Sequence, residues 1–354
     1  MSWTETGLSF AWRADLLDPA TRAVVAPLER VTAVRVSANM NTSPRLTGSL
    51  DVVLTTPLEV TRYMVQVSVE VTRSTGETQW GGPVLTGWVQ AGDSIILATG
   101  VATSLEILDP TVSLDDVVGE AYAVPSGSLV TTTVGAIVSA AVGVPPVTED
   151  SSETTRAGMS WDPDATWRSI CTDLLSSAGY AALTADARGR IHAAPYVLPA
   201  GRGIQAPDLG PGLARDGATV ENRAPDVPNH LITVSSSDGE TEPLIAERWD
   251  TDPASRWSVP SRGGRVVPRV ETGVEATSQE ALEAYADRLW ALARSRGRSF
   301  RVEARWHPVE LSERRRVILR DLVDTTATVE AYSWSADAGQ PPSAVEIHLQ
   351  EVVT

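Results

Sequence analysis

Apolar and polar residues alternate one by one along several short segments of this chain, and this alternation constrains its fold most strongly. Residues 63–72 (YMVQVSVEVT) place an apolar side chain at every odd position, and residues 46–54 (LTGSLDVVL) repeat the device. Successive side chains of a β-strand point to opposite faces, so both segments are predicted to be half-buried strands. Further strands are expected near residues 8–14, 31–38, 84–90 and 94–103, with turns at 39–44, 75–76, 81–83 and 92–93. This density of short strands predicts a barrel or sandwich over the first hundred residues.

The middle of the chain changes to helical periodicity. A helix is predicted over 128–142, ended by Gly143, and a clearer one over 163–178 with apolar residues three and four apart. Gly179 stands where a left-handed cap is needed. A hairpin over 180–195 follows, with its turn at 186–189. The Gly- and Pro-rich stretch 199–218 is interpreted as a linker or an extended crossover.

The last third is predicted to be β again, with one strong helix. The expected strands are 229–236, 299–306 and 343–352. Thr277 and Glu280 form a capping box for a helix over 278–296 that Gly297 ends. The chain is therefore expected to be mainly β with α+β insertions. We expect a β-barrel domain at 1–105, a mixed α/β domain at 106–200 carrying the helix 163–178 and the hairpin 180–195, and a second β-barrel domain at 201–354 carrying the helix 278–296.

The charge of the chain limits its partners. The formal net charge is −16, and all 29 basic residues are arginine. Such a surface repels phosphate, so nucleic-acid binding is not expected, although it suits a wall past which DNA slides. The first residues lack the features of a secretion signal, and no run of about 18 apolar residues occurs. We expect folding in a cytoplasm and no membrane insertion.

The sequence shows no recognisable catalytic or metal motif. Cys171 is the single cysteine and lies on the apolar side of the helix 163–178, where a packed thiol is expected. The four histidines are far apart, and without lysine a P-loop or Schiff-base mechanism is excluded. The acidic pairs could in principle serve a hydrolase, but two of them precede prolines, as in turns; they are Asp115-Asp116, Asp162/Asp164 and Asp250/Asp252. We expect no enzyme, no cofactor and no catalytic or metal residue.

The 11 tryptophans leave a second binding hypothesis open. Tryptophans on β-proteins can stack on sugars, but burial in cores or subunit contacts is the more general explanation. Three are predicted on or beside core faces: Trp167, Trp290 and Trp306. The five candidates for exposure are Trp80, Trp88, Trp249, Trp257 and Trp334.

The order of elements resembles a known family. A helix ends in Gly179-Tyr180, a hairpin follows at 186–190, a strand follows proline at 228–234, and an Ala-rich helix at 280–294 leads to a strand and His307-Pro308. This order is similar to the baseplate hub or tail-associated proteins of phage tails, including the late control protein D group and the hubs of contractile injection machines. The resemblance covers about residues 160–350 and, more loosely, the N-terminal barrel. Relatives often place a glycine turn after the His-Pro, whereas residues 311–316 (LSERRR) contain none.

The resemblance implies two tube-type β-barrels joined by small α/β elements, in a trimeric ring that adapts a six-fold tail tube to a three-fold tip. Its partners would be the distal tail ring or tail tube, the tape-measure protein and a tip spike or fibre, with genomic DNA passing through unbound. The location would be a virion tail assembled in the bacterial host cytoplasm. Two alternatives are a hexameric distal tail ring protein and a tail-tip carbohydrate-binding adhesin. A third is a hydrolase that uses an Asp pair. The sequence assigns no channel or interface residues.

Overall fold

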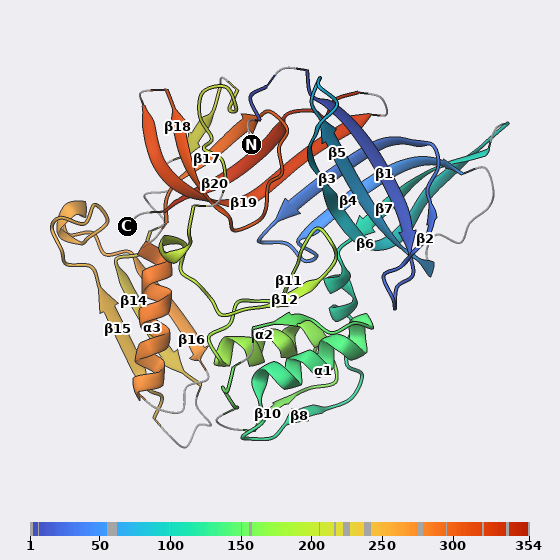
Figure 1. The fold of residues 1–354 in the computed structure, drawn as a ribbon. Coiled ribbons are helices and arrows are strands. Elements are labelled where there is room, and N and C mark those ends of the chain that lie inside the picture. The colour runs from blue at the N-terminus through green and yellow to red at the C-terminus, as the bar shows by residue number, and fades with distance from the viewer. Residues whose placement is uncertain are drawn as a thin grey trace.

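The computed structural model describes most of the chain (Figure 1). The described residues are 3–5, 7–54, 62–98, 100–149, 151–155, 158–204, 206–215, 217–221, 227–236, 242–274, 279–294, 296–320, 322–337 and 340–352. Strands dominate, and the helices gather in two units below the main sheet. The expected class, mainly β with α+β insertions, is confirmed. Within these residues, no helix is long and apolar enough to cross a membrane.

Seven strands form the N-terminal part, and their alternation is the predicted one. They are β1 (Ser9–Leu17), β2 (Val24–Pro27), β3 (Val31–Asn39), β4 (Leu46–Leu54), β5 (Met64–Thr72), β6 (Thr78–Leu97) and β7 (Gly100–Leu108). The turns predicted at 81–83 and 92–93 are wrong, because both stretches lie inside the long strand β6. Pro83 sits at a register shift against β5, where a ladder bond is already interrupted. A second irregularity, between Ala91 and Ser94, accommodates Gly92.

Five strands form the C-terminal part of the same sheet. They are β13 (Thr219–Glu221), β17 (Arg296–Ala304), β18 (Arg314–Leu319), β19 (Val323–Asp337) and β20 (Val345–Val352). Before β18, Ser312 adopts a φ of 66°, so a serine takes a left-handed conformation in this stretch without glycine.

The two parts repeat one topology. In each part, the five strands pair in the same spatial order: the first, second, fifth, fourth and third strand along the chain. This order is β3-β4-β7-β6-β5 in one part and β13-β17-β20-β19-β18 in the other. Every pairing within both sets is antiparallel. We call the first set the N-terminal repeat and the second the C-terminal repeat.

The repeats are joined through β19, which changes partners along its length. Residues 323–328 pair with β18, and residues 331–337 pair with β3 of the N-terminal repeat. The described strands of both repeats, together with β1 and β2, thus form one sheet of 12 strands with one shared hydrophobic core. The two barrels are predicted as separate domains, and the described strands of both lie in this one sheet.

The stretch 199–218 is more than a linker. After a 3₁₀ turn at Pro199–Gly201, the Leu209 amide donates to Arg316 O (2.9 Å) and Leu209 O accepts from the Ile318 amide (2.8 Å). Farther on, Leu213 O accepts from the Arg305 amide (2.9 Å). The segment therefore lies between β18 and β17 and connects the two sides of the C-terminal repeat.

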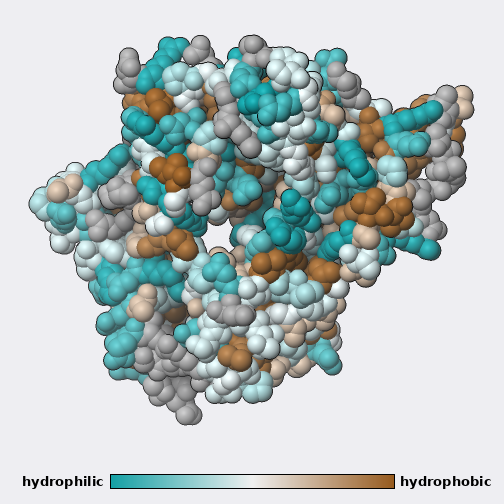
Figure 2. Space-filling view, in the orientation of Figure 1, coloured by the Kyte–Doolittle hydropathy of each residue, from teal (hydrophilic) through white to brown (hydrophobic). Residues whose placement is uncertain are grey.

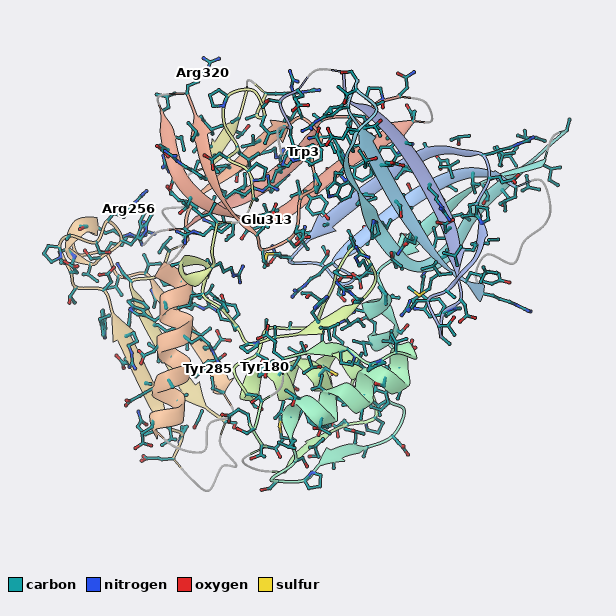
Figure 3. All side chains as sticks on the ribbon, in the orientation of Figure 1. Trp3, Tyr180, Arg256, Tyr285, Glu313 and Arg320 are labelled. Carbon is teal, nitrogen blue, oxygen red and sulfur yellow. The ribbon has the colours of Figure 1, made fainter. Side chains whose placement is uncertain are left out.

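The helix predicted at 278–296 belongs to a unit inserted between β13 and β17. Helix α3 (Gln279–Arg294) covers one face of a sheet of β14 (His230–Ser235), β15 (Ile245–Trp249) and β16 (Pro268–Val274), with a small core of its own. Figure 3 shows Tyr285 on this helix. The helix therefore does not pack as part of a barrel spanning 201–354, because its apolar stripe is buried against the inserted sheet. Thr277 lies outside the described residues. A 3₁₀ turn at Pro260–Arg262 completes the unit.

The middle unit follows the prediction closely. It contains α1 (Val130–Val142), α2 (Trp167–Ser177), a 3₁₀ turn at Pro110–Leu114 and five short strands: β8 (Tyr122–Val124), β9 (Val147–Thr148), β10 (Met159–Trp161), β11 (Thr184–Ala185) and β12 (Ile191–Ala193). Gly143 (φ 84°) and Gly179 (φ 76°) take the predicted left-handed conformation. Helix α2 begins later than expected, because the Thr166 side chain accepts from the Ser169 amide and caps it.

Candidate functional site

The sheet presents a polar face where the two repeats meet. In β3, Val34 and Val36 point into the core, so Arg35 and Ser37 point outward. The ladders align outward residues into rows across the junction: Ser333, Ser37 and Thr47 in one, and Ser335, Arg35, Ser49 and Glu106 in the next. Strand alternation and the β19–β3 pairing together therefore create one continuous surface from two repeats.

This polar face is shaped as an open groove of about 840 Å³. The groove is lined by small hydroxyl side chains of β3, β4, β7 and β19, which are Ser37, Thr47, Ser49, Ser104, Ser333 and Ser335. Ser343, which precedes β20, also lines it. Its arginines are matched by carboxylates: Arg35 lies 3.1 Å from Asp51, and Arg215 lies 3.9 Å from Glu303. Short hydroxyls and exposed, paired charges offer only weak, water-exchangeable contacts to a passing chain.

A buried polar network lies within the C-terminal repeat. The Arg315 guanidinium is fully buried and donates to Pro308 O (3.1 Å), to Glu313 Oε1 through Nε (2.6 Å) and to His307 Nε2. Since arginine only donates, His307 must carry its proton on Nδ1, which donates to Arg305 O (2.7 Å). Burial, reinforced by the charge of Arg315, lowers the pKa of His307 to about 3.

Stability should fall in acid because of His307. The imidazole is neutral in the folded chain, whereas an unfolded histidine has a pKa near 6.5, so unfolding takes up a proton below that pH. The stabilisation is present above about pH 6.5 and is lost progressively as the pH falls toward about 3. Urea unfolding at stepped pH should show a shallower dependence in His307→Gln. The control His348→Gln removes a 40% exposed imidazole and should keep the wild-type slope.

The other histidines and the cysteine have local structural contacts. His230 stacks on Trp249 with ring centroids 3.5 Å apart and lies 3.1 Å from Glu247. His192 lies 3.1 Å from Asp186 in the hairpin. Cys171 is buried, and burial raises its thiol pKa to about 12, which makes it a poor nucleophile.

Two of the three acidic pairs contribute to an ion pair or a turn. Asp115 pairs with Arg168 at 2.5 Å. Asp250 accepts from Ser255 Oγ (2.5 Å), and Asp252 accepts from the Ala254 amide (2.9 Å), so both stabilise one turn. In the part of the chain that the structure describes, no three metal-ligating side chains gather.

The tryptophans fill cores more than surfaces. Of the five candidates for exposure, Trp257 and Trp334 are buried, Trp80 and Trp88 are partly buried, and Trp249 is 46% exposed. Exposure of Trp257 and Trp334 was therefore the wrong expectation. The polar face was not predicted, although one sequence pattern indicates it. In Tyr332-Ser333-Trp334-Ser335, large buried rings alternate with small outward hydroxyls.

Comparison with solved structures identifies the fold. The chain is similar to a tail protein from Neisseria meningitidis (TM-score 0.66, 13% identity, 96% of this chain and 97% of that chain). It is also similar to the 43 kDa tail protein of prophage MuSo2 from Shewanella oneidensis (0.63, 14%, 98% of both chains). A third match is an E. coli type VI secretion component described as similar to the phage T4 tail proteins gp27 and gp5 (0.51, 10%, 96% and 76%). No protein-family model and no curated protein matches the chain. The resemblance seen in the sequence is thus confirmed at the level of the fold.

Proposed function

Because the chain has the fold of phage tail proteins and of a type VI secretion component, we propose that it is a structural hub of a phage or phage-like tail tip, located in the virion tail. Three copies form a ring. The observation that carries this proposal is the repeated topology: two equivalent five-stranded repeats per chain make six equivalent units from three chains. Such a ring adapts a six-fold tail tube to a three-fold tip.

The polar face fits the wall of the central channel. It spans the junction of the repeats, and its paired charges give a passing polymer no unbalanced positive charge to bind. A chain with a net charge of −16 also repels DNA. Genomic DNA and the tape-measure protein would pass without specific binding, between the distal ring or tail tube on one side and a spike or fibre on the other.

A non-enzymatic role agrees with the chemistry of the described residues. His307 and Arg315 are buried, Asp115 is held in an ion pair, and Asp250 and Asp252 stabilise a turn. A carbohydrate-binding adhesin is less well supported, because an aromatic platform needs several exposed rings and Trp249 is the most exposed of the five candidates.

Native mass measurement tests the proposal. The purified chain, alone or co-expressed with the tail-tube protein of its own gene cluster, should give an assembly with three copies. Six copies would favour the distal ring protein. A monomer under both conditions would contradict the hub.

A further inference from the structure

Among the described strands, the outer half of β6, residues 89–97, lacks a partner along the edge where the equivalent part of β19 has one. Residues 78–88 of β6 pair with β5, as residues 323–328 of β19 pair with β18. Beyond that point, β19 continues along β3 of the other repeat. In β6 the corresponding residues pair with β7 on one side, and no described strand pairs with them on the other.

The first strand of the C-terminal repeat is the matching open partner. Strand β13 ends the described path of the sheet and pairs with β17 alone among the described strands. Its equivalent, β3, is bound on both sides, by β4 and by β19. Among the described strands, one chain therefore pairs the fourth strand of the C-terminal repeat with the first strand of the N-terminal repeat. The fourth strand of the N-terminal repeat and the first strand of the C-terminal repeat have no such partner among these strands.

The two open edges lie at opposite ends of the molecule. Figure 1 shows the β6–β7 arm at the far right and the olive strand β13 beside β17 at the upper left. The arm is apolar at its tip, where Ile95 is 65% and Ile96 is 87% exposed, and Val220 in β13 is 44% exposed. Figure 2 shows apolar surface along this arm. An exposed apolar strand edge is a template for pairing with another strand.

We infer that the outer half of β6 pairs antiparallel with β13 of a second copy of this chain, which continues the internal β19–β3 junction around a closed ring. This inference rests on the proposed trimeric hub and names its contact. Each chain would supply one internal and one external junction, so three chains would make six equivalent junctions. Two different surfaces meet head to tail in such a contact, and this geometry closes rings.

One row of ladder partners across each repeat fixes the register. In the N-terminal repeat the row runs through Trp88, Leu108, Thr47 and Ser37. In the C-terminal repeat it runs through Thr328, Gln350, Ser299 and Glu221. Trp88 and Thr328 are equivalent because each is the farthest residue of its strand that still pairs with the third strand of the repeat.

Counting from this row identifies the opposed residues. Ser335 lies seven residues after Thr328 and Ile95 lies seven after Trp88, with one irregularity in each interval. Arg35 precedes Ser37 by two residues, as Thr219 precedes Glu221. Since Ser335 is opposite Arg35 inside the chain, Ile95 of one copy should be opposite Thr219 of the next.

Cysteine cross-linking tests this register, because the single native thiol, Cys171, is buried. Directly opposed residues of an antiparallel pair stand at distances that a disulfide can bridge. Under mild oxidation, Ile95→Cys/Thr219→Cys should give covalent dimers and trimers on a denaturing gel that a reductant collapses to monomers. Arg35→Cys/Ser335→Cys, the internal equivalent, should form a disulfide within one chain. Ile95→Cys/Val25→Cys places the second thiol on β2, at the other end of the sheet path, and should not cross-link.

A single variant gives an independent readout. Ile95 is mostly exposed in the isolated chain, so Ile95→Arg should keep the circular dichroism spectrum and the thermal midpoint of the monomer but shift the native mass from three copies to one. If the native mass shows a trimer while Ile95→Cys/Thr219→Cys stays uncross-linked, the strand pairing is overturned and the hub proposal stands. If no trimer forms with or without a tube partner, both are overturned.

Discussion

Replacing Trp306 with alanine is expected to lower the free energy of unfolding by about 3–5 kcal/mol, the range for removing a large buried aromatic side chain. Trp306 is 5% exposed and lies at the centre of a cluster from both repeats. Its ring contacts those of Trp3, Phe10, Trp12, Trp80 and Trp334 at centroid distances between 5.5 and 6.3 Å. Figure 3 shows Trp3 between the two repeats.

All five contacts have edge-to-face geometry, and three of them are with residues of β1 and β6, so the substitution would also loosen the junction between the repeats. Urea unfolding followed by far-ultraviolet circular dichroism measures the loss. The matched control is Trp249→Ala, where the ring is 46% exposed, stacks on His230 and donates to Glu247 Oε2 (3.1 Å), so about 1 kcal/mol is expected. Equal losses in the two variants would contradict the central packing role of Trp306.

Replacing Glu313 with leucine should have an effect of similar size, about 3–5 kcal/mol, because it leaves a buried charge without its counter-ion. The Arg315 side chain is 0% exposed and cannot lose its proton at any ordinary pH. Its remaining hydrogen-bond partners, His307 and Pro308 O, are neutral. Figure 3 shows Glu313 at the lower edge of the C-terminal repeat.

Removing both charges should be milder than removing one. Glu313→Leu/Arg315→Met exchanges the ion pair for apolar side chains, and such exchanges are often nearly neutral. The control Glu346→Leu removes a half-exposed carboxylate 3.3 Å from Arg301 and should cost less than about 1 kcal/mol. A double variant less stable than Glu313→Leu would show that Arg315 contributes through its other contacts.

Local patterns in the sequence predicted the elements well. Alternation located β4, β5 and β20, and helix spacing with a terminal glycine located α1 and the end of α2. These features depend on neighbours a few residues away, so a single segment contains the information. The long strand β6 was predicted as two because Gly92 is typical of a turn, whereas here it occupies a bulge that only the pairing with β7 reveals.

The arrangement of the elements could not be predicted in the same way. The repeat is hidden because the inserted α/β unit separates β13 from β17, while β3 and β4 are joined by a short connection. The polar face depends on ladders between strands about 300 residues apart, such as Ser333 against Ser37. The burial of Arg315 beside His307 likewise follows from tertiary packing, since neither side chain is apolar.

Electron cryomicroscopy of the assembled protein tests the central claim most directly. A reconstruction should show three chains around a channel, with six equivalent five-stranded repeats, the hydroxyl-lined groove of Ser37 and Ser333 facing inward, and β6 of each chain beside β13 of the next. A reconstruction with that groove facing outward, or with any number of chains other than three in the ring, would contradict the proposed hub.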